Sequence, residues 1–167
     1  FRELYQKTIT CLYEDNEKNV WVGTRLNGLY RLSAEGKTIN RFPIDALRLE
    51  GGMINFISSI TELSKNEMLV GTFGEGAFIF DKQKKNFFRY TPRTKEEEKG
   101  FGYVTQIHNS GNGCYVLTNR TFYKITNDED VVLWQNNIIT APTTFLIDNC
   151  GIIWIGSDGS GIVKLEP

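Results

Sequence analysis

The chain has one histidine, three cysteines and four prolines among its 167 residues. A catalytic triad or a His-based metal site would need His108 beside nucleophiles or further ligands, yet Asn109, Ser110 and Gly111 follow it in an expected turn. The cysteines, Cys11, Cys114 and Cys150, are odd in number and far apart, which fits neither a disulfide framework nor a Cys-x-x-Cys metal site. We therefore expect no catalytic residue, no metal and no cofactor in this chain.

An excess of either charge is also missing, because 19 Lys and Arg oppose 20 Asp and Glu and leave a net charge of −1. Binding to nucleic acid or to an anionic membrane surface needs an excess of cationic side chains on one face, so we expect neither partner. The longest apolar runs, such as residues 151–156, are too short for a transmembrane helix. Residues 1–5 have neither an initiator Met nor an apolar leader, so we expect the chain to be part of a longer protein.

Glycines and aromatic residues are plentiful, with 16 Gly, 11 Phe, 7 Tyr and 3 Trp, which favours short strands joined by tight turns. A short motif repeats along the chain at intervals of roughly 40 to 48 residues, close to the period of a four-stranded propeller blade. Its four copies are Trp-Val-Gly-Thr at 21–24, Leu-Val-Gly-Thr at 69–72, Tyr-Val-Leu-Thr at 115–118 and Trp-Ile-Gly-Ser at 154–157. The third copy is the most degenerate.

Each motif lies in a unit that is expected to form four strands joined by three turns. The second strand contains the Trp position, the turn after it is closed by a glycine, and the turn before the fourth strand is polar. In three units a further glycine comes five residues after the first, and we expect it to supply a positive φ in the turn. We expect the first glycine to allow close backbone approach, and the Trp position to pack between neighbouring units. These structural repeat residues are Trp21, Gly23, Gly28, Gly71, Gly76, Trp154, Gly156 and Gly161.

A single four-stranded meander cannot cover both of its faces, so the units are expected to stack radially. The sequence thus predicts an all-β protein, a β-propeller of about four antiparallel blades. Residues 1–6 are considered as an outer strand of a preceding blade, or as the strand that completes the last blade and closes a four-bladed ring. The blades are expected at about 8–45, 54–91, 101–135 and 142–167, with the last one incomplete.

Two stretches carry a family resemblance, with Asp15, Trp21 and Gly23 inside residues 9–31 and the same residue types inside residues 145–162. Both resemble the two-component regulator propeller repeat. The resemblance implies part of a seven-bladed ring in the periplasmic sensor region of a hybrid two-component system. It also implies an oligosaccharide or other small ligand, the remaining blades and a β-sandwich as partners, and a homodimer. Nothing in the chain resembles a phosphoacceptor helix or an ATP site.

In a propeller, the turns between second and third strands project on one face, together with the links between blades. On that face we expect hydrogen-bonding side chains beside one aromatic, which suits a carbohydrate ligand, although each could also be an ordinary turn residue. The candidate ligand-binding residues are Arg25, Asn27, Phe73, Glu75, Arg120 and Asp158. Leu26, Asn119, Ser160 and the links 43–55 and 91–100 are expected beside them.

We therefore expect a non-catalytic, periplasmic ligand-sensing propeller whose kinase lies elsewhere in the full-length protein. One alternative is a propeller scaffold for protein–protein interaction in a surface or secretion assembly. Another is a propeller enzyme of the lyase type, which would rely on histidines and metal ligands in the central channel; the single His108 disfavours it.

Overall fold

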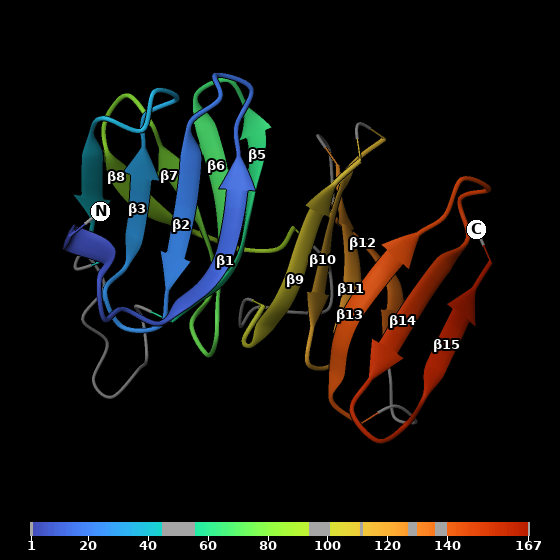
Figure 1. The fold of residues 1–167 in the computed structure, drawn as a ribbon. Coiled ribbons are helices and arrows are strands. Elements are labelled where there is room, and N and C mark those ends of the chain that lie inside the picture. Colours follow the sequence, from blue (N-terminus) through green and yellow to red (C-terminus); the bar gives the residue numbers. More distant parts are fainter. Residues whose placement is uncertain are drawn as a thin grey trace.

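The computed structural model describes residues 2–44, 56–93, 101–110, 112–126, 130–135 and 140–166. Its strands form four antiparallel sheets, each with its strands in chain order, so every sheet is an up-and-down meander. Three sheets have four strands, and the last has three in the part of the chain that is described. The prediction of an all-β propeller with four blades is confirmed, and Figure 1 shows the blades in sequence order.

Blade 1 comprises β1 (Ile9–Glu14), β2 (Val20–Thr24), β3 (Leu29–Leu32) and β4 (Ile39–Phe42). Blade 2 comprises β5 (Ile57–Ser64), β6 (Glu67–Thr72), β7 (Gly76–Asp81) and β8 (Asn86–Tyr90). Blade 3 comprises β9 (Val104–Asn109), β10 (Cys114–Thr118), β11 (Thr121–Ile125) and β12 (Asp130–Gln135). Blade 4 comprises β13 (Pro142–Ile147), β14 (Ile153–Ser157) and β15 (Ile162–Leu165).

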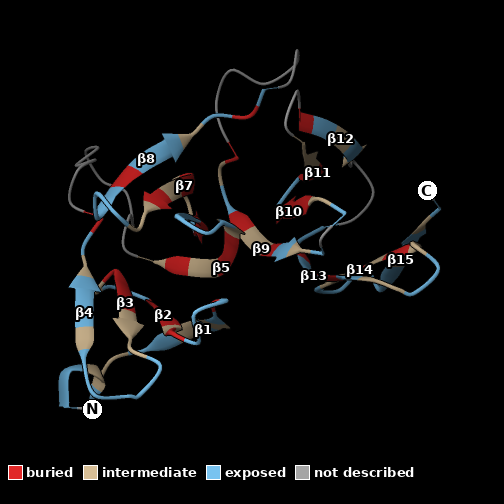
Figure 2. Ribbon diagram, turned by 90° about the horizontal axis from the view of Figure 1, so that it is seen from above, coloured by how far each residue is buried: buried red, intermediate tan, exposed pale blue. Residues whose placement is uncertain are grey.

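The blades stand in an arc with blade 1 and blade 4 at opposite ends (Figure 2). The first strands of neighbouring blades contact one another, β1 with β5, β5 with β9 and β9 with β13, so they line the inside of the arc. The apolar core is divided into three layers between successive blades. Trp21 and Phe80 lie in the first layer, Leu69 and Val104 in the second. The third layer includes Tyr115 of blade 3 and Phe145 of blade 4, and in this way each blade buries a face that it could not cover itself.

The glycine at the end of the second strand marks where the next blade comes closest. A Cβ atom on Gly71 would lie 2.5 Å from Cγ1 of Val104 and 3.0 Å from Cδ1 of Ile107, both on β9 of blade 3. Gly23 is crowded in the same way, with Cγ2 of Ile57 in blade 2 at 2.8 Å from such an atom. The turn glycines have a different role, since Gly76 has a φ of 78°, which L-residues with a side chain rarely adopt.

Replacing Gly71 with alanine should therefore lower the free energy of unfolding by about 1–3 kcal/mol, because the methyl group overpacks the layer between blades 2 and 3. Gly156→Ala is the matched control. Its Cβ would meet only Thr144 of its own strand pair, with the nearest atom at 3.0 Å. Urea titrations of both variants measure the difference, and an equal loss at the two positions would contradict the close-approach explanation.

Two expectations need correction. Residues 2–6, expected as part of an outer strand, form no strand, because Arg2–Leu4 is a 3₁₀ helix. The amides of Tyr5 and Lys7 donate to the carbonyls of Arg2 and Leu4, both at 3.2 Å, so local bonds replace those of a sheet. The turn that was expected to begin at Asn109 begins later, because β9 runs through the exposed His108 to Asn109.

Candidate functional site

Each turn between a second and a third strand is fixed by a hydroxyl at the end of the second strand. The Oγ1 of Thr24 donates to the carbonyl of Gly28 at 2.7 Å and accepts the amide of Asn27 at 3.0 Å. Thr72 makes the same pair of bonds in blade 2, and the hydroxyls of Thr118 and Ser157 donate to the corresponding carbonyls in blades 3 and 4. These hydrogen bonds fix the backbone of each turn and therefore hold its side chains in defined positions.

A second repeated bond joins each turn to the start of its blade. The amide of Phe73 donates to the carbonyl of Phe56 at 2.9 Å, and the amide of Asn119 donates to that of Tyr103 at 3.0 Å. Blades 1 and 4 have the same bond between Arg25 and Thr8 and between Asp158 and Ala141. We call the eight residues joined in this way the mouth row: Thr8, Arg25, Phe56, Phe73, Tyr103, Asn119, Ala141 and Asp158.

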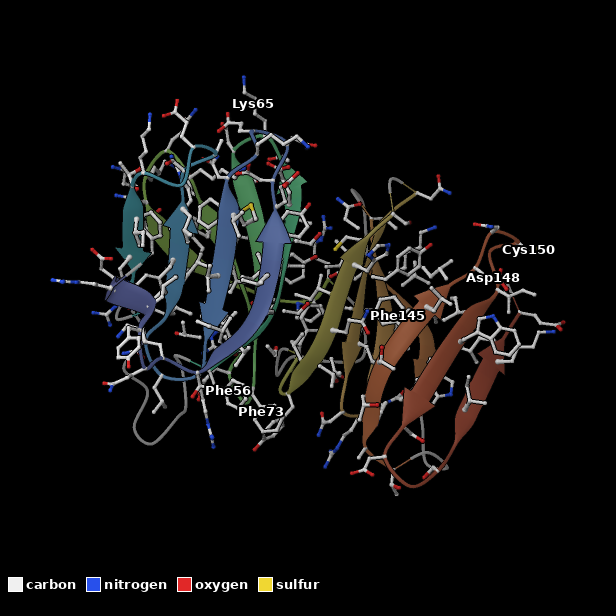
Figure 3. All side chains as sticks on the ribbon, in the orientation of Figure 1. Phe56, Lys65, Phe73, Phe145, Asp148 and Cys150 are labelled. Carbon is white, nitrogen blue, oxygen red and sulfur yellow. The ribbon has the colours of Figure 1, made fainter. Side chains whose placement is uncertain are left out.

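Aromatic rings occupy the centre of the mouth row. The rings of Phe56 and Phe73 stack with centroids 5.1 Å apart, and the Tyr103 ring meets Phe73 edge to face at 4.9 Å. The Arg25 guanidinium lies 5.7 Å from the centroid of the Phe56 ring, within the range of a cation–π interaction. Phe73 and Tyr103 remain 39% and 45% exposed. Figure 3 shows Phe56 and Phe73 together at the lower ends of blades 1 and 2.

A pocket of about 340 Å³ opens beside these rings. Apolar surface comes from Phe73, Tyr103 and Pro142, and hydrogen-bonding groups come from Asn119 and Asp158. The remaining lining residues are Val104, Thr105, Ala141 and Thr143. Aromatic walls with a few convergent polar groups are typical of a site for a small ligand.

The structure brings together only part of the predicted ligand-binding set. Phe73 and Asp158 line the pocket, and Arg25 lies at the far end of the aromatic series. Asn27 and Glu75 instead hold their turns in place. The Asn27 carbonyl accepts a hydrogen bond from Nε of Arg41 at 2.9 Å, and the Glu75 carboxylate forms an ion pair with Arg89 at 3.2 Å.

Arg120 is not among the lining residues; its amide donates to Thr118 Oγ1 at 3.2 Å. Residues 45–55 and 94–100 of the two links lie outside the described residues. Arg93, in the described part of the second link, pairs with Asp130 at the outer edge of blade 3.

Phe56 and Tyr103 were not predicted as site residues. Each directly precedes the first strand of its blade, β5 or β9, and a position before a strand was not treated as part of the face. A signal for them exists in the sequence, because an aromatic immediately before the alternating run occurs in both central units. The repeated amide-to-carbonyl bond, which only the structure shows, places that position next to the turn.

A larger cavity of about 900 Å³ lies between blades 2 and 3. Tyr90 and Arg93 line it and are both bound to the buried Asp130 carboxylate, at 2.9 Å from the phenol and 3.3 Å from the guanidinium. Burial and the Asp130 charge raise the pKa of Tyr90, so the phenol stays protonated and donates. These contacts join the two blades, and we assign the residues a structural role.

Within the described ranges, no group of three or more His, Cys, Asp and Glu side chains is arranged to hold a metal ion. No helix in the same residues is both long and apolar enough to cross a membrane.

Comparisons with known proteins agree with this architecture. Residues 6–25 match the family model described as two component regulator propeller. Among solved structures, the extracellular domain of the hybrid two component system BT3049 from B. thetaiotaomicron is 23% identical with a TM-score of 0.70, over 90% of this chain and 20% of that one. A search of curated protein sequences found no match.

The extracellular domain of the hybrid two component system BT4673 from B. thetaiotaomicron is 21% identical with a TM-score of 0.71, over 95% of this chain and 23% of that one. The computationally designed Ika4 protein is 12% identical with a TM-score of 0.64, over 96% of this chain and 91% of Ika4. The chain thus spans about a fifth of the two extracellular domains. The chain has the β-propeller fold, and its residues 6–25 match the two-component regulator propeller repeat.

Proposed function

We propose that this chain is part of the extracytoplasmic ligand-sensing propeller of a hybrid two-component system, within a ring of about seven blades. The observation that carries the proposal is the exposed aromatic surface of the mouth row beside its pocket, on the same face as the repeated turns. The propeller repeat at residues 6–25 and the likeness to two extracellular domains of such systems support the location.

The chemistry of the mouth row favours an oligosaccharide as the ligand. The apolar face of a sugar ring packs on exposed aromatic rings, which Phe73 and Tyr103 supply. Sugar hydroxyls need donors and acceptors at the edge of such a platform, and Asn119 and Asp158 provide both. Arg25 at the far end adds a cation that would suit a sulfated or uronic sugar.

The mouth row would bind its ligand without catalysing a reaction. Ligand binding at the mouth would favour one packing of the propeller against the rest of the protein, and the kinase elsewhere would respond to that shift. The scaffold role in a surface or secretion assembly is the runner-up, and it requires no small-molecule binding at the mouth row.

The test is calorimetry on the full-length extracytoplasmic region with a panel of oligosaccharides. We expect Phe73→Ala and Tyr103→Ala each to weaken binding by roughly 30-fold, the effect of removing an aromatic hot-spot residue worth about 2 kcal/mol. Phe88→Ala is the matched control, because Phe88 is 47% exposed but belongs to the outer strand β8. Arg120→Ala is expected to leave affinity unchanged. Unaltered binding by the Phe73 and Tyr103 variants, or no binding by any sugar, would refute the assignment.

A further inference from the structure

One position in the second strand of every blade is aromatic except in blade 2. Trp21, Tyr115 and Trp154 occupy it in blades 1, 3 and 4, and Leu69 occupies it in blade 2. The rings of Trp21 and Tyr115 belong to the first and third apolar layers, between their own blade and the next. The middle layer, between blades 2 and 3, therefore lacks the ring that the repeat places in the other two.

Side chains from both neighbouring blades surround the ring of Trp21 in the first layer. Phe42 of blade 1 and Phe80 of blade 2 lie with their ring centroids 5.9 and 5.5 Å from it. The Arg31 guanidinium lies 5.9 Å from the Trp21 ring centroid, and Asp15 accepts the indole N–H at 2.8 Å. These four neighbours define the place in the junction that an aromatic ring fills.

The same place can be located between blades 2 and 3. Strand register, and for one residue its position eight residues before the glycine, identifies the counterparts of the four neighbours around Leu69. They are Leu63 for Asp15, Ile79 for Arg31, Tyr90 for Phe42 and Ile125 for Phe80. All four counterparts line the cavity of about 900 Å³ between blades 2 and 3. The cavity therefore lies where the ring of Trp21 lies in the preceding junction.

Blade 3 also supplies smaller side chains to this junction than blade 2 supplies to the first. Cys114 stands where blade 2 has Met68, and Ile125 stands where it has Phe80. Burial raises the pKa of the Cys114 thiol to about 12, so this wall is uncharged at neutral pH. Smaller side chains on both walls leave unfilled space, and a cavity lined by such residues accepts an apolar molecule of suitable size.

The charged side chains around the cavity already have partners. The Arg93 guanidinium lies 3.3 Å from the Asp130 carboxylate. Nζ of Lys124 lies 5.7 Å from the centroid of an aromatic ring in the layer between blades 3 and 4. The Glu67 carboxylate accepts the Ser64 hydroxyl at 3.3 Å. A charged ligand group would compete with these contacts, so the cavity favours an uncharged ligand.

The cavity is separate from the mouth row. Its lining includes residues of the turns between first and second strands, β5–β6 and β9–β10. Figure 3 shows Lys65 of the β5–β6 turn at the upper end of blade 2, whereas Phe56 and Phe73 of the mouth row lie at the lower end. A ligand in the cavity would therefore not overlap with a ligand at the mouth row.

We propose that the cavity between blades 2 and 3 binds an uncharged aromatic molecule, whose ring takes the place that Trp21 fills between blades 1 and 2. Tyr90 gives this ring a fixed aromatic neighbour, because it stacks on Phe101 with centroids 5.5 Å apart and donates to Asp130 at 2.9 Å. The bound ring would join blades 2 and 3 as Trp21 joins blades 1 and 2. This inference does not depend on a sugar at the mouth row.

Indole, the ring of the Trp21 side chain itself, is the probe, and calorimetry measures its binding to the intact protein that contains this chain. We expect Leu69→Trp to weaken indole binding by roughly 30-fold or more, because the new side chain occupies the cavity. Ile125→Phe fills the cavity from blade 3 and should weaken binding by about 10-fold. Leu133→Trp is the matched control, since it adds an indole to the exposed outer strand β12 and should leave affinity unchanged.

The outcomes decide between the cavity and other sites. The proposal is overturned if the unmodified protein does not bind indole, or if Ile125→Phe and a folded Leu69→Trp variant bind it equally well. Circular dichroism establishes folding, and Ile125→Phe alone decides the question if Leu69→Trp does not fold. Loss of indole binding in Phe73→Ala would place the ring at the mouth row and also overturn the proposal. Sugar binding by the two cavity variants should be unchanged, so the two sites are tested independently.

Discussion

Replacing Trp21 with alanine should lower the free energy of unfolding by about 3–5 kcal/mol, the cost of removing a fully buried large aromatic from a packed layer. Its ring contacts Phe42 of its own blade and Phe80 of the next, and its indole N–H is bound to Asp15. The substitution therefore removes packing between two blades and leaves a buried carboxylate without one of its donors.

Trp154→Ala is the control, because it removes the same residue type at the same register position from a face that is partly exposed. Its cost in this chain should be less than half as large. Guanidinium denaturation followed by circular dichroism measures both variants. Equal losses would show that the tryptophan stabilises its own blade and that interblade burial contributes little.

The second large effect is expected at Lys82, whose side chain is 8% exposed between the Asp15 carboxylate, 0% exposed, and that of Glu62, 5% exposed. Lys82→Met should cost about 3–5 kcal/mol, because it leaves two buried carboxylates without a counter-charge. Lys84→Met should change stability by about 0–1 kcal/mol, as its ion pair with Asp81 is exposed to solvent.

A triple variant separates the charge effect from simple packing. Asp15→Asn and Glu62→Gln added to Lys82→Met remove all three charges and should recover part of the lost stability, since no uncompensated ion is then buried. Denaturation at neutral pH gives the comparison. If the triple variant is no more stable than Lys82→Met alone, the loss comes from packing of the lysine stem and not from the charges.

Much of the fold can be predicted from the sequence because the same pattern of strands and turns recurs in successive units. The period-2 alternation of residues 9–14 and the glycines at 23 and 28 define strands and turns with local information alone. An outer strand was considered for residues 1–6 because an apolar and charged mixture of that length suits an extended strand equally well, but residues 2–6 form none. The deciding factor was the set of local bonds that closes the 3₁₀ turn at Arg2–Leu4.

The candidate site was predicted less completely. The turn positions, including Phe73 and Asp158, follow from the repeat, but their grouping with Tyr103 depends on how strands of different blades are staggered. The ion pair between Lys82 and Asp15 joins residues 67 positions apart. Asp15 could be read as a turn residue from its neighbours, but its partner could not, because no local pattern specifies which lysine reaches it.

The polar contacts that cross the three junctions are chemically different, although the blades share one fold. Blades 1 and 2 share the buried ions Lys82, Asp15 and Glu62. Blades 2 and 3 are joined by the Asp130 carboxylate with Tyr90 and Arg93, and by the Ser59 hydroxyl with the backbone of Ile107. Blades 3 and 4 use the side-chain amide of Gln106 with the backbone of Phe145. A blade placed beside the wrong neighbour would bury groups without partners. These contacts therefore specify the order of the blades and disfavour exchange of similar repeats between molecules during folding.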